Sequence, residues 1–206
     1  HVTELAGHLQ THAVFCSLTP SAGGRVVLQQ LGQQKPWELS FHIDSEFDQL
    51  VLALRHIGVR HIHFHHLIGH GPRVLHLPEQ LGVQYDFTAH DFYTLCPQIS
   101  LTDSTNSYCG ERGVEQCRSC LRVAPAPGGM DIETWRANYG DFVAKARYVL
   151  APSRDVAQRF SRFAPTATIR HVPHTDMPLA NSLPAPMPRQ LTGKAPLKIV
   201  VVGALS

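Results

Sequence analysis

A histidine and an aspartate follow directly on an apolar, strand-like run. Residues 83–89 predict a strand, and His90 and Asp91 stand just past its carboxyl end. A histidine next to an aspartate at the end of a strand points to chemistry at that position. Ligands of parallel α/β sheets bind beyond the carboxyl ends of the strands. We therefore expect His90 and Asp91 to line a ligand site.

Four of the five cysteines fall in a short, turn-rich insertion at residues 96–120. Two of them have the Cys-x-x-Cys spacing, and the four together suit one tetrahedral zinc ion: Cys96, Cys109, Cys117 and Cys120. Such a closed four-sulfur site would be structural and would hold the loop beside His90. One or two disulfides, or free thiols in a mobile loop, are the alternatives, and the residues alone leave them open.

Two further strands are predicted to end in polar residues at the same rim. The run at 60–64 is followed by His65 and His66, and the run at 148–151 is followed by Ser153. The two histidines either line a ligand site at this rim or are half-exposed strand ends. For Ser153 the simpler interpretation is the N-cap of the next helix.

Strands and helices alternate along the chain. Strands are predicted at 12–18, 26–31, 37–43, 60–64, 83–89, 148–151 and 168–172, and helices at 1–9, 44–57, 72–81, 132–146 and after Ser153. Ser45 with Asp48 has capping-box spacing, and Gly58 is expected to end the second helix. This order predicts an α/β fold: a Rossmann-like, doubly wound, mostly parallel sheet with helices on both faces.

The domain boundary is predicted near residue 173. Residues 1–172 form the expected Rossmann-like domain, and the proline-rich stretch 173–196 is typical of a linker. Residues 197–203 are a nearly continuous apolar run ending in Gly203, like the first strand of a new doubly wound domain. Residues 197–206 are therefore assigned to that domain.

The composition excludes some function classes. A net charge of +2 gives no reason to expect a nucleic-acid partner, and no apolar run is long enough to span a bilayer. The 14 histidines would make the chain markedly more cationic in mild acid. Five cysteines with metal-like spacing favour a reducing, cytoplasmic compartment, and Cys16 is most simply a core residue.

Four blocks of the sequence resemble the N-terminal domain of retaining, family-four glycosyltransferases of the GT-B type. They are residues 1–6, residues 62–66, the stretch 88–97 with its downstream cysteines, and residues 148–153. The third block is the strongest and is similar to bacterial polysaccharide and O-antigen members. The family's first strand and glycine-rich loop are not in the sequence, and its donor-binding domain is represented by one strand.

The resemblance implies a hexosyl-type transferase that moves a sugar from a nucleotide-sugar donor to a glycan or lipid-linked acceptor. It places His90 near the transferred sugar, with Asp91 fixing either the orientation of His90 or the local loop. It adds Tyr93 to the acceptor cleft with His65, His66 and Ser153, and assigns Gly203 to the donor side. It also implies peripheral contact with the inner face of a membrane. We expect the 206-residue chain to be inactive alone.

Two other functions remain open at this stage. One is a non-catalytic Rossmann-like module that binds a glycan or a protein and carries a structural zinc knuckle. The other is an epimerase of the same architecture, which would need a second acid–base group in the cleft.

Overall fold

The computed structural model describes residues 6, 7, 9, 11–32, 37–103, 105, 107–111 and 113–173. The chain divides into two compact units, 1–173 and 174–206, and all described residues belong to the first. The linker and second-domain strand predicted beyond 173, with Gly203, therefore lie outside the described residues. So does most of the helix predicted at 1–9.

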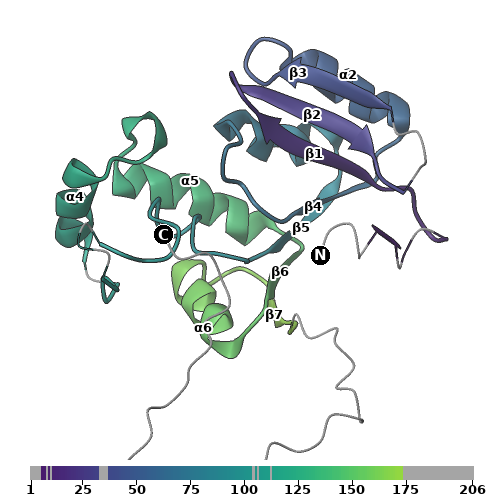
Figure 1. The fold of residues 1–206 in the computed structure, drawn as a ribbon. Coiled ribbons are helices and arrows are strands. Elements are labelled where there is room, and N and C mark those ends of the chain that lie inside the picture. The colour runs from purple at the N-terminus through teal and green to yellow at the C-terminus, as the bar shows by residue number, and fades with distance from the viewer. Residues whose placement is uncertain are drawn as a thin grey trace, which may run out of the picture. The chain divides into compact units, whose positions relative to one another are not determined.

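The N-terminal strands form a three-stranded antiparallel sheet (Figure 1). In order, they are β1 (Cys16–Ser21), β2 (Arg25–Gln30) and β3 (Glu38–His42). The β1–β2 hairpin turns through Gly23 and Gly24, whose φ angles of +69° and +70° favour glycine. So short a connection cannot lead to a parallel neighbour. The three predicted strands exist, but the prediction that they join one parallel sheet is wrong.

Helix α2 (Phe47–Ile57) packs against this sheet through a buried apolar stripe. It ends at Gly58 with φ +80°, as predicted. The predicted capping box of Ser45 and Asp48 does not form. The N-cap is Glu46, whose carboxylate accepts a 2.6 Å hydrogen bond from the backbone N–H of His42 and so ties the helix start to β3.

The second sheet is the parallel one. Its strands are β4 (His61–Phe64), β5 (Gln84–Thr88), β6 (Tyr148–Ala151) and β7 (Ile169–His171), hydrogen-bonded in that order. A four-stranded parallel sheet flanked by helices confirms the α/β class and is compatible with a Rossmann-like fold. The order of the described strands does not reverse, so the doubly wound arrangement stays a prediction.

Helices make every crossover between these strands. A 3₁₀ turn η1 (Pro72–His76) and α3 (Leu77–Leu81) join β4 to β5; α4 (Val114–Val123), the 3₁₀ turn η2 (Pro127–Gly129) and α5 (Ile132–Lys145) join β5 to β6; α6 (Arg154–Phe163) joins β6 to β7. The single helix predicted at 72–81 is thus two pieces. Helix α4 was not predicted. No helix in the described ranges is long and apolar enough to cross a bilayer.

One face of the parallel sheet is an aromatic core. The ring of Phe142 on α5 lies 5.0 Å from those of Phe64 and Tyr85 and 5.6 Å from that of Phe87. Phe160 of α6 is fully buried and contacts Phe87 at 6.0 Å. Right-handed crossovers that all advance in one direction place their helices on one face, which agrees with these contacts.

The opposite face of β4 and β5 is polar. Because side chains alternate along a strand, His61 and His63 of β4 share this face with Asp86 and Thr88 of β5. Parallel strands are usually apolar on both faces. The polar face of β4 and β5 therefore indicates a role in addition to core packing.

Candidate functional site

The three histidines and the aspartate predicted at the strand ends lie within hydrogen-bonding distance of one another in two pairs. His65 and His66 follow β4, and His90 and Asp91 follow β5, its hydrogen-bonded neighbour. His65 Nδ1 lies 2.9 Å from His90 Nε2, and His66 Nδ1 lies 3.0 Å from Asp91 Oδ2. The strand-end rule therefore brings together these four side chains, as expected.

These contacts continue a ladder that starts inside the sheet. His61 bonds Asp86 at 3.0 Å and His63 bonds Thr88 at 2.7 Å, and each partner is 25 residues further along the chain, as in the two strand-end pairs. The constant separation shows that parallel register persists past the last strand residues. The ladder, defined by these four pairs, is one row of imidazoles and their acceptors.

The imidazole rings of the ladder also stack. Ring centroids are 4.2 Å apart for His63 and His65, 5.2 Å for His65 and His90, and 4.7 Å for His66 and His90. A hydrogen bond between two ring nitrogens needs one N–H donor and one unprotonated acceptor, so the His65–His90 bond fixes complementary states at the two bonded atoms.

Burial and neighbouring charge keep His65 neutral. Burial of the ring, followed by the proximity of His63, His90 and His66, lowers the pKa of His65 from 6.5 to about 3. Burial likewise lowers the pKa of His63. At neutral pH both rings can therefore exchange hydrogen bonds with a hydroxyl group without carrying charge.

The low pKa of His65 predicts a pH dependence of stability. Between its folded pKa of about 3 and the unfolded value of about 6.5, the unfolded chain binds the extra proton. The free energy of unfolding should therefore fall as the pH is lowered through this window. A His65→Gln variant should show a shallower fall, and His56→Gln, at an exposed position on α2, should follow the wild type. Urea midpoints at about pH 7 and about pH 5 test this, and equal slopes in all three proteins would contradict it.

Asp91 both orients a histidine and shapes its own loop. Its Oδ2 pairs with His66 and its Oδ1 accepts the backbone N–H of Tyr93 at 2.9 Å. Tyr93 itself is 6% exposed, with its ring 4.9 Å from Trp135 and 5.7 Å from Tyr139. The structure thus places Tyr93 in the core beneath the site and favours a packing role over ligand contact.

Ser153 occupies the position of a helix cap. Its hydroxyl accepts the backbone N–H of Val156 at 3.2 Å at the start of α6, which is the simpler of the two interpretations made from the sequence.

Asp86, at the start of the ladder, also forms an ion pair that the sequence did not predict. Arg147, directly before β6, donates from Nε at 2.9 Å and from Nη2 at 2.5 Å to Asp86, which is 8% exposed. Burial works to raise the pKa of Asp86, but the bonds and charges of Arg147 and His61 outweigh it and lower that pKa. The only sequence signal was an aspartate inside an apolar strand, whose partner is 61 residues away.

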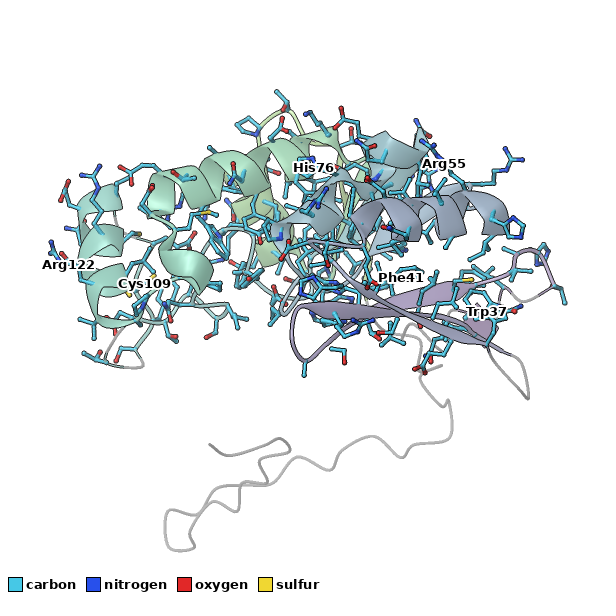
Figure 2. All side chains as sticks on the ribbon, turned by 90° about the horizontal axis from the view of Figure 1, so that it is seen from above. Trp37, Phe41, Arg55, His76, Cys109 and Arg122 are labelled. Atoms are coloured by element: carbon cyan, nitrogen blue, oxygen red, sulfur yellow. The ribbon has the colours of Figure 1, made fainter. Side chains whose placement is uncertain are left out.

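The four cysteines of the insertion line one cavity of about 330 Å³. All five cysteines are half-buried, and Cys16 lies apart in β1. In Figure 2, Cys109 and Arg122 mark the part of the molecule that contains α4. Among the described residues, no three His, Cys, Asp or Glu side chains already stand in a metal-binding arrangement. Sequence spacing therefore identified a cluster, but not its bonding.

Comparisons with known proteins add no relative. No family model, no curated protein and no solved structure matches the chain. The ladder and the thiol cavity must therefore be interpreted on their own chemistry.

Proposed function

We propose that the chain is the acceptor-side domain of a retaining glycosyltransferase of GT-B architecture. The intact enzyme would transfer a hexosyl group from a nucleotide-sugar donor to a glycan or lipid-linked acceptor in the cytoplasm, at the inner face of the membrane. The observation that carries the proposal is the meeting of His65, His66, His90 and Asp91 at the carboxyl edge of a parallel sheet. That edge is where α/β sheets bind ligands.

The chemistry of this edge suits a sugar. Hydroxyl groups both donate and accept hydrogen bonds, and neutral imidazoles do the same. His90 would bond a hydroxyl of the transferred sugar, His65 would fix the orientation of His90 through their 2.9 Å bond, and Asp91 would hold His66 beside them. The uncharged state of His65 also avoids repelling positive charge that develops on the sugar ring during transfer.

The donor side belongs to the second domain proposed to start at residues 197–206. A nucleotide sugar leaves its diphosphate behind, and basic groups and a helix N-terminus stabilise that charge in such enzymes. We place the start of this domain at the apolar strand ending in Gly203. The doubly wound order of the first sheet is part of the same proposal.

The test is a turnover assay on the full-length protein that contains this chain. Release of nucleoside diphosphate from a panel of sugar nucleotides would be measured with a lipid or glycan extract as acceptor. We expect His90→Ala to lower kcat/KM by about 100-fold, since positioned hydrogen-bonding and acid–base groups contribute factors of this size. His56→Ala, which removes an exposed histidine from α2, should leave kcat/KM within about twofold.

The unfolding midpoint of each variant would be measured beside its kinetics. A wild-type protein that binds glycan but releases no nucleoside diphosphate would replace the proposal with the glycan-binding module. A folded His90→Ala protein with wild-type kcat/KM would remove the histidine cluster from the mechanism.

A further inference from the structure

Helix α4 has no hydrophobic core of its own. None of its ten residues is buried, and Leu121 alone among the described core contacts reaches partly into the core from this helix. Surface ion pairs link Arg118 to Glu115 and Glu133, and the Gln98 side chain donates at 2.7 Å to the carbonyl of Ala124. Exposed ion pairs contribute little stability, so these contacts are weak support for the helix.

Two cysteines of α4 line the cavity in the insertion. Cys117 and Cys120 are three residues apart and so share one face of the helix. They line the 330 Å³ cavity together with Cys96, from the loop after β5, and Cys109, from the turn before α4. Three separate chain segments thus direct thiols to one space.

Three of these sulfurs receive hydrogen bonds. The backbone N–H of Glu111 donates to Cys109 Sγ at 3.4 Å, and Nη2 of Arg136 donates to Cys117 Sγ at 3.4 Å. The backbone of Gln98 bonds Cys96, two residues before it, just as Glu111 bonds Cys109, although burial is the larger effect and raises the pKa of the Cys96 thiol. These N–H groups hold the sulfurs only weakly, because a thiol is a weak acceptor.

The backbone of the insertion is strained in the same places. Ile99, Leu101 and Glu111 have φ angles of 55°, 57° and 52°, and within the described ranges they are the non-glycine residues with positive φ. Such a backbone conformation is unfavourable for these residues and persists where its surroundings impose it. Ile99 lies three residues after Cys96 and Glu111 two residues after Cys109, so the strain lies next to two of the cysteines.

We propose that Cys96, Cys109, Cys117 and Cys120 bind one structural zinc ion that takes the place of a hydrophobic core under α4. Zinc prefers four tetrahedral thiolates, and soft sulfur ligands favour it over magnesium or calcium. Four thiols lose four protons as four Zn–S bonds form, which leaves a net charge of −2 at the site. Arg136 stands beside it to offset part of that charge.

The four sulfurs do not yet stand in a metal-binding arrangement, so the site would form when the cysteine side chains rotate toward one another in the cavity that they line. A closed shell of four sulfurs has no open position, so this zinc would not activate water, and its role would be to fix α4 and the loop that follows His90. The inference is independent of glycosyl transfer, because the site would form in a binding module equally well.

The first test is the metal content of the 206-residue chain, purified without chelator and analysed for elements. We expect one zinc per chain, with four thiols protected until the protein is denatured in the presence of chelator. Replacement of zinc by cobalt should give the visible absorption bands of a tetrahedral cobalt–thiolate centre. This spectrum distinguishes sulfur ligands from zinc held by the histidine ladder.

Variants then assign the ligands. Cys117→Ser should lose most of the zinc and the cobalt–thiolate bands, whereas Cys16→Ser, the matched control in β1, and His90→Ala should keep both. Because Cys117→Ser could unfold the insertion, hydrogen exchange of the wild type would be compared before and after chelation. Protection should fall in 96–123 and persist in β1–β3.

Three results would overturn the proposal. They are zinc-free protein that takes up neither zinc nor cobalt when reduced, disulfides among the four cysteines in freshly purified protein, and a Cys117→Ser variant with full zinc content.

Discussion

Replacing Trp135 by alanine is expected to lower the free energy of unfolding by about 3–5 kcal/mol. Trp135 on α5 is 2% exposed, and its indole N–H donates at 2.9 Å to the carbonyl of Tyr93. The variant leaves a cavity and also a buried carbonyl without its donor. Because Tyr93 is bonded to Asp91, the damage should reach the histidine cluster as well. Urea unfolding followed by far-ultraviolet circular dichroism measures the loss.

Trp37→Ala is the matched control for this prediction. Trp37 is half-buried before β3, and its indole N–H donates at 2.8 Å to Gln30. We expect it to cost about 1–2 kcal/mol, as is usual for a partly exposed site. Equal losses in the two variants would show that α5 does not anchor the loop after β5.

Replacing Arg147 by alanine is expected to cost about 1–3 kcal/mol, because it leaves the Asp86 carboxylate, whose side chain is 11% exposed, without its main partner, while Arg147 itself is 43% exposed. Asp86→Asn in the same chain should recover part of this loss, since a neutral amide is less costly to bury than an unpaired charge. The ion pair holds the Asp86 pKa below its usual value. Its stabilisation is therefore present above the unfolded pKa of about 4 and lost as pH falls through the folded pKa.

Lys145→Ala supplies the contrast for Arg147→Ala. Lys145 and Asp141 form a 2.7 Å ion pair with side chains 69% and 62% exposed. An exposed pair of this kind contributes at most about 1 kcal/mol. A double-mutant cycle on Arg147 and Asp86 gives their coupling energy directly. A coupling no larger than that of Lys145 with Asp141 would mean that the polar sheet face is solvated, not structural.

The elements that could be predicted are those whose limits are fixed locally. The strand at 148–151 has the bounds of β6, because an apolar run is stopped there by Pro152 and by the capping Ser153. Gly58 ends α2 for an equally local reason. The capping box at Ser45 failed because Glu46 bonds β3 instead, and that contact depends on tertiary structure.

Partners in the sheets were harder to predict than the strands themselves. Periodicity locates a strand but does not name its neighbour, although Gly23 and Gly24 carried a hairpin signal for β1 and β2. Helix α4 was not predicted because none of its residues is buried and only Leu121 packs against the core, so its apolar pattern is weak. The strand-end rule placed His65 near His90, but the bond between them depends on register that no local pattern encodes.

The order of the strands also sets the lengths of the loops that must close when the chain folds. The β1–β2 hairpin joins Ser21 to Arg25, the histidine ladder closes over 25 residues, and Asp86 meets Arg147 over 61. The entropy lost on closing a loop rises with its length, by about 0.6 kcal/mol per doubling. On this ground we expect the hairpin to form before β6 pairs with β5, and the shorter loop should let His61 reach Asp86 before Arg147 does.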